Sequence, residues 1–299
     1  MKTNSLSAWL LAVRPYSLGN SVILVLVGSA MAFADGRFRP ETALLCLLFA
    51  LLMQCTANLV NDLCDFQRGA DQPDRLGPDR AFAKGYITPG AMKGGILAFT
   101  LASCATGIGL LALSGWDWSL IAVGAACVIF AYFYTAGPWP LAYHGLGDVA
   151  VILFFGVIPV GFTYYLQTGF WGWEITVVAL ALGLVIDTML MINNFRDREE
   201  DRRCNKRTIV VYLGAAFGRW GYLLLGVGAV ALCLSLAATR QWVAALLPLP
   251  YLAFHIATWR KMVRIDHGEE LNICLGETAR NIMLFGALLS IGILLDHWI

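Results

Sequence analysis

Apolar stretches separated by short polar segments run along almost the whole chain. A helix rises 1.5 Å per residue, so about 20 apolar residues are needed to cross about 30 Å of hydrocarbon. A short amphipathic segment at residues 6–13 precedes the first long stretch, and Thr88-Pro89 is typical of a helix start. The pattern predicts nine transmembrane helices, at about residues 17–34, 42–61, 89–113, 117–134, 148–166, 173–192, 220–238, 242–260 and 278–295.

Composition agrees with this pattern. Hydrophobic residues make up 59% of the chain and charged residues 14%, which predicts an all-α integral membrane protein, here taken as a single domain of residues 1–299. No cleavable signal peptide is expected, because the first apolar stretch is too long and lacks a small-residue processing site. The eight cysteines include no Cys-x-x-Cys pair and lie mostly in apolar stretches, so we expect neither a disulfide nor a zinc site.

Basic residues orient the predicted helices. If the N-terminus is cytoplasmic, all of the 21 Lys and Arg residues except Arg37, Arg39 and Arg240 fall at cytoplasmic ends and loops. This bias predicts a multi-pass protein of the inner (cytoplasmic) membrane, with residues 58–71 and 193–201 on the cytoplasmic side. The net charge of +1 gives no reason to expect a nucleic-acid partner.

Polar and acidic side chains end the second predicted helix, directly after the uncharged stretch 42–57. Asn58, Asp62 and Asp65 share one helical face, and Asn61 lies one turn before Asp65. Carboxylates at the edge of hydrocarbon are costly and repel one another, so such a group commonly holds a cation. Oxygen ligands of this kind suit a divalent ion such as Mg²⁺. A solvated helix end with capping Asn and Asp side chains is the alternative interpretation.

A second group of the same kind ends the sixth predicted helix. Asn194, Asp197 and Asp201 follow the apolar stretch 175–192 at helical spacings of three, four and seven residues. Two such groups, each at the end of an apolar helix, are less expected by chance than one. If the two groups face each other, they can hold a diphosphate between metal ions.

Basic side chains accompany both acidic groups. Arg75, Arg80 and Lys84 follow the first group, and Arg196 and Lys206 flank the second. A diphosphate bound to metal through some of its oxygens would accept hydrogen bonds from such cations through the others. The positive-inside bias explains the same charges equally well.

Aromatic residues and two further acids lie between or near the two groups. Tyr134 and Tyr143 either line an aromatic pocket or belong to the belt of Tyr and Trp at a membrane interface. Asp148 begins the fifth predicted helix, where an acidic residue is favoured. Asp187 lies deeper, seven residues before Asn194 and on the same face. An ionisable group at that depth is a functional candidate, although a hydrogen-bonded structural role also fits.

Together these motifs resemble those of the UbiA superfamily of intramembrane aromatic prenyltransferases, over about residues 10–290. The resemblance rests on Arg14-Pro15, Asn61-Asp62-x-x-Asp65 with Gly69-x-Asp71, and Asn193-Asn194-x-x-Asp197-x-x-x-Asp201. The branch that prenylates 1,4-dihydroxy-2-naphthoate in menaquinone synthesis is similar in further details, namely Asp74-Arg75-x-Gly77-Pro78-x-Arg80, Tyr134-Thr-x-Gly-Pro, Gly145-Leu-Gly147-Asp148 and Lys206-x-Thr208. Cys204-Asn205 departs from that branch, which usually has Gly before Lys206, and leaves the diphosphate contacts of this loop open.

The resemblance implies nine transmembrane helices around a central cavity, with a cytoplasmic cap and a lateral opening for an isoprenoid tail. It implies two Mg²⁺ ions, replaceable by Mn²⁺, with the ligands Asn61, Asp62, Asp65, Asp71, Asn194, Asp197 and Asp201. The catalytic residues implied are Asp65, Asp197, Lys206 and Arg75. The substrate-binding residues implied are Arg14, Asn58, Arg80, Lys84, Tyr134, Tyr143, Asp148 and Arg196.

The reaction implied by the resemblance joins a polyprenyl diphosphate to an aromatic acceptor within the lipid bilayer. Diphosphate leaves, the naphthoate ring attacks the allylic cation, and loss of CO₂ restores aromaticity and gives demethylmenaquinol. Another acceptor, such as 4-hydroxybenzoate, homogentisate or a chlorophyll precursor, would fit the same acidic motifs. A secondary transporter is the alternative from another class, although transporter sites usually lie near the membrane midplane on broken helices. The length of the isoprenoid chain and the oligomeric state are left open.

Overall fold

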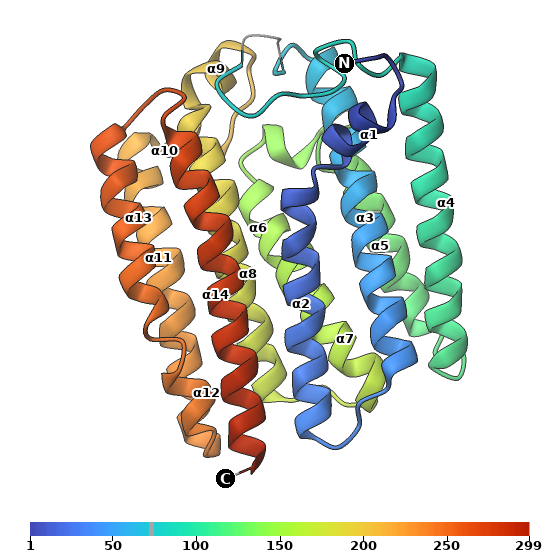
Figure 1. The fold of residues 1–299 in the computed structure, drawn as a ribbon, viewed down its shortest axis with the longest axis vertical. Helices are drawn as coiled ribbons and strands as arrows, with labels where there is room; N and C mark the ends of the chain where they lie inside the picture. Colours follow the sequence, from blue (N-terminus) through green and yellow to red (C-terminus); the bar gives the residue numbers. More distant parts are fainter. Residues whose placement is uncertain (72–74, 299) are drawn as a thin grey trace.

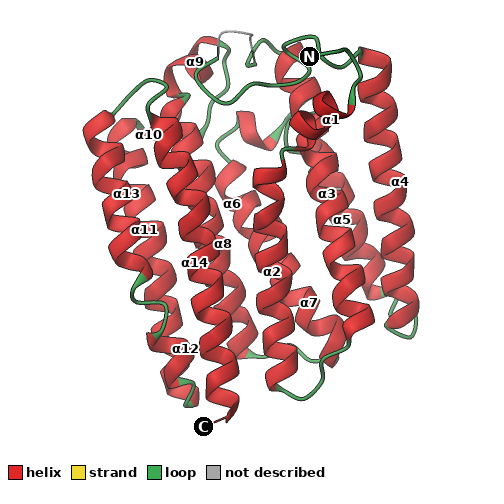
Figure 2. Ribbon diagram, viewed as in Figure 1, coloured by secondary structure: helices red, strands yellow, loops and turns green. Residues whose placement is uncertain are grey.

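The computed structural model describes residues 1–71 and 75–298, so Asp74 of the predicted arginine motif lies outside the described residues. Within these ranges the chain is all-helical and forms no β-strand apart from one isolated bridge between His144 and Arg207 (Figure 2). The α-helices are α1 (Leu6–Val13), α2 (Pro15–Ala34), α3 (Pro40–Gln67), α4 (Pro89–Leu113), α5 (Ser119–Phe133), α6 (Gly147–Ile152), α7 (Ile158–Thr168), α8 (Trp173–Arg196), α9 (Arg198–Arg203), α10 (Ile209–Leu213), α11 (Ala215–Leu234), α12 (Trp242–Leu246), α13 (Tyr251–Ile265) and α14 (Leu271–Trp298). The 3₁₀ segments η1 (Leu141–Tyr143) and η3 (Ser235–Thr239) and the π-helical segment η2 (Leu153–Val157) connect some of them.

Among the described residues, eight helices are long and apolar enough to cross a membrane, and they correspond to eight of the nine predicted spans. They are Pro15–Ala34, Pro40–Gln67, Pro89–Leu113, Gly147–Thr168, Trp173–Arg196, Ala215–Thr239, Trp242–Ile265 and Leu271–Trp298. The ninth predicted span, at about residues 117–134, is α5, an apolar helix of 15 residues. Because about 20 residues are needed to cross the hydrocarbon, the prediction of nine full spans is confirmed for eight.

Local sequence sets several of the helix starts. The hydroxyl of Thr88 accepts a hydrogen bond from the backbone N–H of Ala91, and Pro89 is the first residue of α4, as the sequence predicts. Thr208 caps α10 in the same way through the N–H of Val211. Arg14 separates α1 from α2 by adopting a left-handed conformation, with a φ of 55°.

Helix α8 is the central helix of the bundle. In its apolar stretch 72% of the residues are buried, against 28–44% in the other seven spans. It packs against α2, α6, α7, α11 and α14. Residues at the end of α8 are therefore held by neighbours on several sides, which makes this helix a rigid support for a site (Figure 1).

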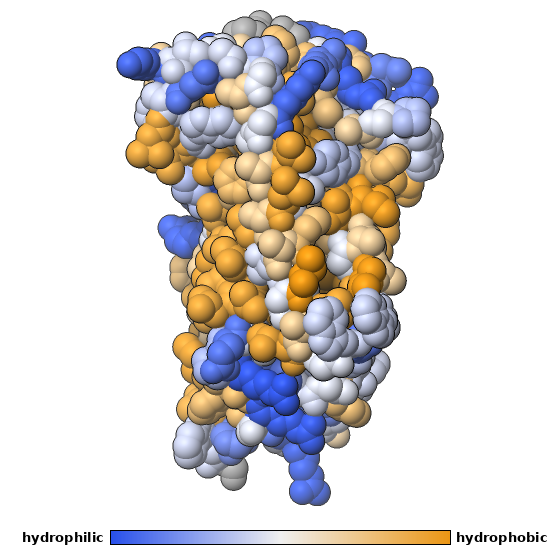
Figure 3. Space-filling view, turned by 90° about the vertical axis from the view of Figure 1, so that its right-hand side faces the viewer, coloured by the Kyte–Doolittle hydropathy of each residue, from blue (hydrophilic) through white to orange (hydrophobic). Residues whose placement is uncertain are grey.

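The surface has the polarity that a bilayer requires. Apolar side chains cover the middle of the face in Figure 3, and hydrophilic side chains gather toward its top and its bottom. Large exposed apolar residues include Leu26, Leu101, Ile108 and Ile129, all on the long helices or α5. In water such a surface would be unfavourable, and in lipid it is not.

Candidate active site

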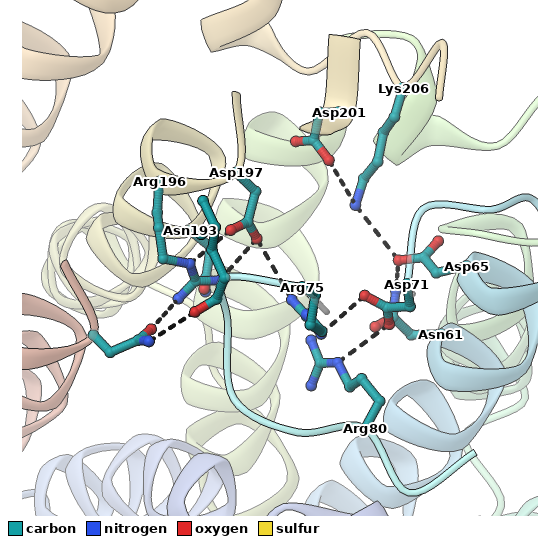
Figure 4. Close-up of polar contacts among 12 residues, drawn as sticks. Asn61, Asp65, Asp71, Arg75, Arg80, Asn193, Arg196, Asp197, Asp201 and Lys206 are labelled. Carbon is teal, nitrogen blue, oxygen red and sulfur yellow. Dashed lines mark hydrogen bonds and ion pairs between the residues drawn. The ribbon is translucent and has the colours of Figure 1, made fainter. Parts of the chain in front are cut away.

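Both acidic groups lie at the end of the bundle that carries the N-terminus (Figure 1). The first group occupies the last turns of α3, and the second ends α8 and continues into α9. The loops that follow α3 and α9 cross the same end of the bundle, and Figure 4 shows the acidic side chains converging there with basic ones. The structure thus brings together two motifs that are far apart in the sequence.

Ten charged side chains at this end form two ion-pair networks, one of Lys206 with Asp65 and Asp201 and one of the other seven. Asn61 links the two networks, because it accepts a hydrogen bond from Arg14 and donates one to Asp65, and we call the ten side chains together the charged cluster. Its acidic members are Asp62, Asp65, Asp71, Asp197 and Asp201, and its basic members are Arg14, Arg75, Arg80, Arg196 and Lys206. Each carboxylate pairs with at least one cation. Such pairing is expected, because a buried carboxylate without a counter-charge is strongly unfavourable.

Asp65 receives three polar contacts. The amide of Asn61 donates to its Oδ2 at 2.9 Å, the hydroxyl of Tyr143 donates to its Oδ1 at 2.8 Å, and Lys206 Nζ lies 3.4 Å from Oδ2. Burial and the nearby carboxylate of Asp65 both raise the pKa of Tyr143, so its phenol stays neutral and remains a donor. Asp65 is therefore fixed in position by groups from three parts of the chain.

Lys206 bridges the two acidic groups, because its Nζ is also 3.6 Å from Asp201 Oδ1. Burial alone would lower the pKa of Lys206, but Asp201 and Asp65 outweigh burial and raise it well above its usual value, so the ammonium stays charged. Burial raises the pKa of Asp201 to about 7 in spite of Lys206.

The turn before Lys206 contains Asn205, which has a φ of 59°. Asn tolerates this left-handed conformation better than most residues, so Asn205 can take the place of the usual Gly in this turn.

The loop after α3 supplies a second bridge. Arg75 lies 2.9 Å from Asp71 Oδ1 and 3.5 Å from Asp197 Oδ2, and thus connects the loop to the end of α8. Arg80 Nε donates to Asp71 Oδ2 at 3.2 Å. Burial opposes ionisation of Asp71, but Arg80 and Arg75 outweigh burial and lower its pKa, so Asp71 is a carboxylate at neutral pH.

Asp62 has a different environment from the other acidic members. It is 1% exposed, forms an ion pair with Arg14 and lies 3.6 Å from Arg80 Nε. Arg14 Nη2 also donates to the side-chain oxygen of Asn61 at 3.1 Å. The Asp62 side chain does not line the cavity described below. Asp62 therefore holds two cations in place behind the acidic side chains that face the cavity.

A contact from the last helix holds the loop over the site. Asn272 of α14 donates to the carbonyl of Leu76 at 2.8 Å and accepts from Arg196 Nη1 at 2.8 Å. Arg196 in turn forms a two-pronged contact with Asp197, at 2.6 and 2.7 Å. A Cβ on Gly77 would lie 2.6 Å from a guanidinium nitrogen of both Arg196 and Arg75, so a side chain there would displace them. No sequence motif points to Asn272, which stands alone on a helix far along the chain.

A polar cavity of about 200 Å³ lies between the two acidic groups. Most of the predicted site residues line it, namely Arg14, Asn58, Asn61, Asp65, Asp71, Arg75, Arg80, Tyr134, Asp148, Asn194, Asp197, Asp201 and Lys206. Asp62, Tyr143 and Arg196 lie behind this lining and contact it. Lys84 is not brought to the cavity and pairs instead with Asp79, at 3.3 Å.

An apolar cavity of about 570 Å³ adjoins the polar one. Residues from α2, α3, α4, α5 and α7 line it, and Gln54, Ala57, Phe130 and Phe155 line both cavities. The end of the bundle therefore offers a charged compartment that continues into an apolar one. This shape suits a ligand with an anionic head and an apolar tail.

The chemistry of the polar cavity fits divalent metal ions that share their coordination with a ligand. Within residues 1–71 and 75–298 no three acidic, His or Cys side chains lie close enough to hold one ion by themselves. Mg²⁺ typically binds through one or two carboxylates and completes its shell with water and phosphate oxygens. Asp65 with Asn61, and Asp201 near the end of α8, are donor sets of that kind.

These features define a class, the multi-span membrane proteins with a charged site that opens into an apolar cavity. The UbiA prenyltransferase family model matches residues 21–289, and the chain belongs to this family. It is 34% identical to 1,4-dihydroxy-2-naphthoate octaprenyltransferase of Escherichia coli (strain K12), over 97% of this chain and 96% of that protein. A protein of the same description from Mycobacterium tuberculosis is 34% identical over 82% of this chain and 84% of its own.

The fold is also that of solved members of the family. The structure of a UbiA homolog from Archaeoglobus fulgidus bound to GPP and Mg²⁺ superimposes with a TM-score of 0.66, at 16% identity, and covers 96% of this chain and 99% of its own. At this identity the similarity establishes the fold alone.

Proposed function

We propose that the protein transfers a polyprenyl group from a polyprenyl diphosphate to 1,4-dihydroxy-2-naphthoate, with loss of CO₂ and diphosphate, and so forms demethylmenaquinol. The observation that carries this proposal is the charged cluster at the mouth of an apolar cavity, which matches an isoprenoid diphosphate in charge and in shape. The names of the relatives from Escherichia coli and Mycobacterium tuberculosis support the acceptor.

Asn61, Asp65, Asp71, Asn194, Asp197 and Asp201 would hold the metal, because all six line the polar cavity and offer oxygen donors. We infer two Mg²⁺ ions, replaceable by Mn²⁺, and the Archaeoglobus homolog bound to GPP and Mg²⁺ supports the choice of metal. When bound, these ions neutralise charge on the diphosphate and make it a better leaving group. Asp62 has the separate task of positioning Arg14 and Arg80.

Cations of the chain act on the same diphosphate. Arg75, Arg80 and Lys206 line the polar cavity and can donate to phosphate oxygens that carry no metal. Their donors are already held by carboxylates, so they need little reorganisation as negative charge develops on the departing diphosphate. Of these three cations, Lys206 contacts both acidic groups and so lies between them, where the diphosphate is proposed to bind.

The apolar cavity has two tasks in this proposal. It accommodates the isoprenoid tail, and it keeps water away from the allylic cation, which water would convert to an alcohol. Phe130 and Phe155 line both cavities and so lie where the head joins the tail. The faces of their rings carry partial negative charge, which stabilises a nearby cation.

The site faces the cytoplasm of the inner membrane in this proposal. The charged cluster and the N-terminus lie at the same end of the bundle (Figure 1), and the basic residues of the chain favour that end. A site at one face, reached by a water-soluble acceptor from the cytoplasm and by a lipid from the bilayer, suits a transferase better than a transporter.

An acceptor panel tests the function. Purified protein with Mg²⁺ and one polyprenyl diphosphate is given 1,4-dihydroxy-2-naphthoate, 4-hydroxybenzoate, homogentisate or a chlorophyll precursor, and prenylated product, diphosphate and CO₂ are measured. Product and CO₂ with the naphthoate are expected. Product with a different acceptor alone would replace the naphthoate in the proposal, and uptake into vesicles without any product would favour a transporter.

A further inference from the structure

Two acidic side chains lie outside the charged cluster, on helices that face each other. Asp148 is the second residue of α6, and Asp187 is in α8, ten residues before Asp197. Asp148 is 7% exposed and Asp187 is 1% exposed. Neither forms an ion pair with a described Lys or Arg, and both carboxyl oxygens of Asp148 and Oδ1 of Asp187 lack a hydrogen-bond partner within the described part of the chain.

Close packing of the two helices places these acids together. Gly156, in the π-helical turn after α6, lies against Gly183 of α8, where an added Cβ would be 2.2 Å from the Gly183 Cα. A Cβ built on Gly183 would also lie 2.9 Å from the carbonyl oxygen of Ile152. Ile152 follows Asp148 by one turn of α6, and Gly183 precedes Asp187 by one turn of α8. Because α6 packs on α8, the two acids lie at the same level of this helix contact. A pair of buried acids without a cation is costly, so its presence calls for a ligand or a proton between them.

Asp148 lies on the wall that leads from the charged cluster to the apolar cavity. Asp148, Val151 and Phe155 are spaced three and seven residues apart, and all three line the polar cavity. Phe155 lines the apolar cavity as well. If the diphosphate lies in one cavity and the tail in the other, the reacting carbon of the prenyl group lies near this wall. The hydroxyl of Tyr134 is close by, 3.4 Å from a Cβ built on Gly147.

We propose that Asp148, positioned by Asp187, binds a hydroxyl group of the aromatic acceptor and takes its proton during prenyl transfer. This inference rests on the proposed function, because it assigns a residue to the same reaction. A free carboxylate oxygen is a strong acceptor for a phenol, and among the described carboxylates that line the polar cavity only Asp148 has both oxygens buried without a hydrogen-bond partner.

The proposed step balances without an added reactant. The ring carbon that bears the carboxylate bonds to the first carbon of the prenyl cation, the neighbouring C–OH becomes C=O, and the hydroxyl proton passes to Asp148. The bond to the carboxylate then breaks, CO₂ leaves, and the electron pair of that bond restores the aromatic ring. The oxygen takes its proton back from Asp148, so the carboxylate is regenerated in each turnover.

Four variants test this role. D148N keeps the size of the side chain and its hydrogen bonding but cannot take a proton, and D148L removes both properties. We expect D148N to lower kcat by roughly 100-fold, the low end of the effect of a general base, while the KM for polyprenyl diphosphate and the Mg²⁺ dependence stay unchanged. D148L should in addition raise the KM for the naphthoate. D187N should lower kcat less, and D148N/D187N should be no worse than D148N, because a positioning residue has no effect once its partner is lost.

A second test compares the naphthoate with an analogue in which the hydroxyl next to the carboxylate is methylated. If Asp148 had only a structural role, the difference in binding affinity between the two acceptors would not depend on Asp148. Wild-type protein should bind the hydroxyl form more tightly than the methyl ether, and D148L should bind both alike. Near-normal kcat in D148N, or an equal loss toward both substrates and Mg²⁺, would overturn the inference. Thermal unfolding identifies a variant that fails to fold. Absence of naphthoate product with wild-type protein would instead refute the proposed function, which keeps the two failures apart.

Discussion

Replacing Lys206 by Met removes the charge that connects the two acidic groups. The Nζ atom lies 3.4 Å from Asp65 Oδ2 and 3.6 Å from Asp201 Oδ1, and the two carboxylate side chains are only 4% and 6% exposed. Met has a similar length and apolar character, so packing changes little. The variant therefore leaves two buried carboxylates that face each other without their shared cation.

The expected loss of stability follows from this geometry. Removing one partner of a buried ion pair costs about 3–5 kcal/mol. The Lys206 side chain is 18% exposed, so the lower end, about 3 kcal/mol, applies. At roughly 2 °C per kcal/mol for a chain of this size, Tm should fall by about 6 °C in EDTA. Mg²⁺ between the same carboxylates replaces the lost charge, so the fall should be much smaller in Mg²⁺.

The assay is thermal unfolding of purified protein in detergent, with EDTA and with Mg²⁺, alongside product formation. Turnover should fall by roughly 10²- to 10³-fold, as when one donor to a developing negative charge is lost. Lys84→Met is the matched control, because Lys84 pairs with a carboxylate, Asp79, that is 57% exposed, and such pairs contribute at most about 1 kcal/mol. An equal loss of Tm in EDTA and in Mg²⁺, or near-normal turnover in K206M, would refute the reasoning.

Three further predictions concern the metal, the topology and Arg14. Product formation should stop in excess EDTA and return with Mg²⁺ or Mn²⁺, and D65A should lower turnover by orders of magnitude at unchanged expression, both measured by product assay. With the native cysteines replaced, a cysteine at Gln67 should be labelled from the cytoplasmic side and one at Gly36 from the opposite side only; the reverse pattern would invert the orientation. Because Arg14 contacts Asn61 and Asp62, R14A should raise the KM for polyprenyl diphosphate at least as much as the KM for the naphthoate, as measured by steady-state kinetics. A rise confined to the KM for the naphthoate would show instead that Arg14 binds the acceptor.

Hydrophobic pattern predicted the membrane helices because burial in lipid depends on composition along a single segment. The pattern was less informative about helix ends. The last span was predicted at about residues 278–295, but α14 extends over Leu271–Trp298, since a helix continues through polar residues once it leaves the hydrocarbon. The fourth span was predicted to begin at about residue 117, but α5 begins at Ser119. The side chain of Asp117 accepts hydrogen bonds from the backbone N–H and the hydroxyl of Ser119, just before the helix.

Spacing in the sequence also identified most of the acidic and basic residues of the site, because each motif follows one helix end. It could not assign partners. The contacts of Arg14 with Asp62 and of Asn272 with Leu76 join residues that are 48 and 196 positions apart, and only the packing of the helices brings them together. For the same reason the sequence left Asp148 and Asp187 as separate residues, whereas the contact of Ile152 with Gly183, one turn from each acid, brings them together.

The balance of charge in the charged cluster gives a physical reason for a metal requirement. Five carboxylates face five cations, so the cluster is close to neutral before any ligand arrives. A diphosphate adds several negative charges. Each cation of the chain can donate to a phosphate oxygen, but its charge is already balanced by its own buried carboxylate, and breaking that pair would cost several kcal/mol. Divalent ions that enter with the diphosphate would supply positive charge to the diphosphate and to the carboxylates alike. The same residues can therefore hold the site together without a ligand and still bind an anionic substrate.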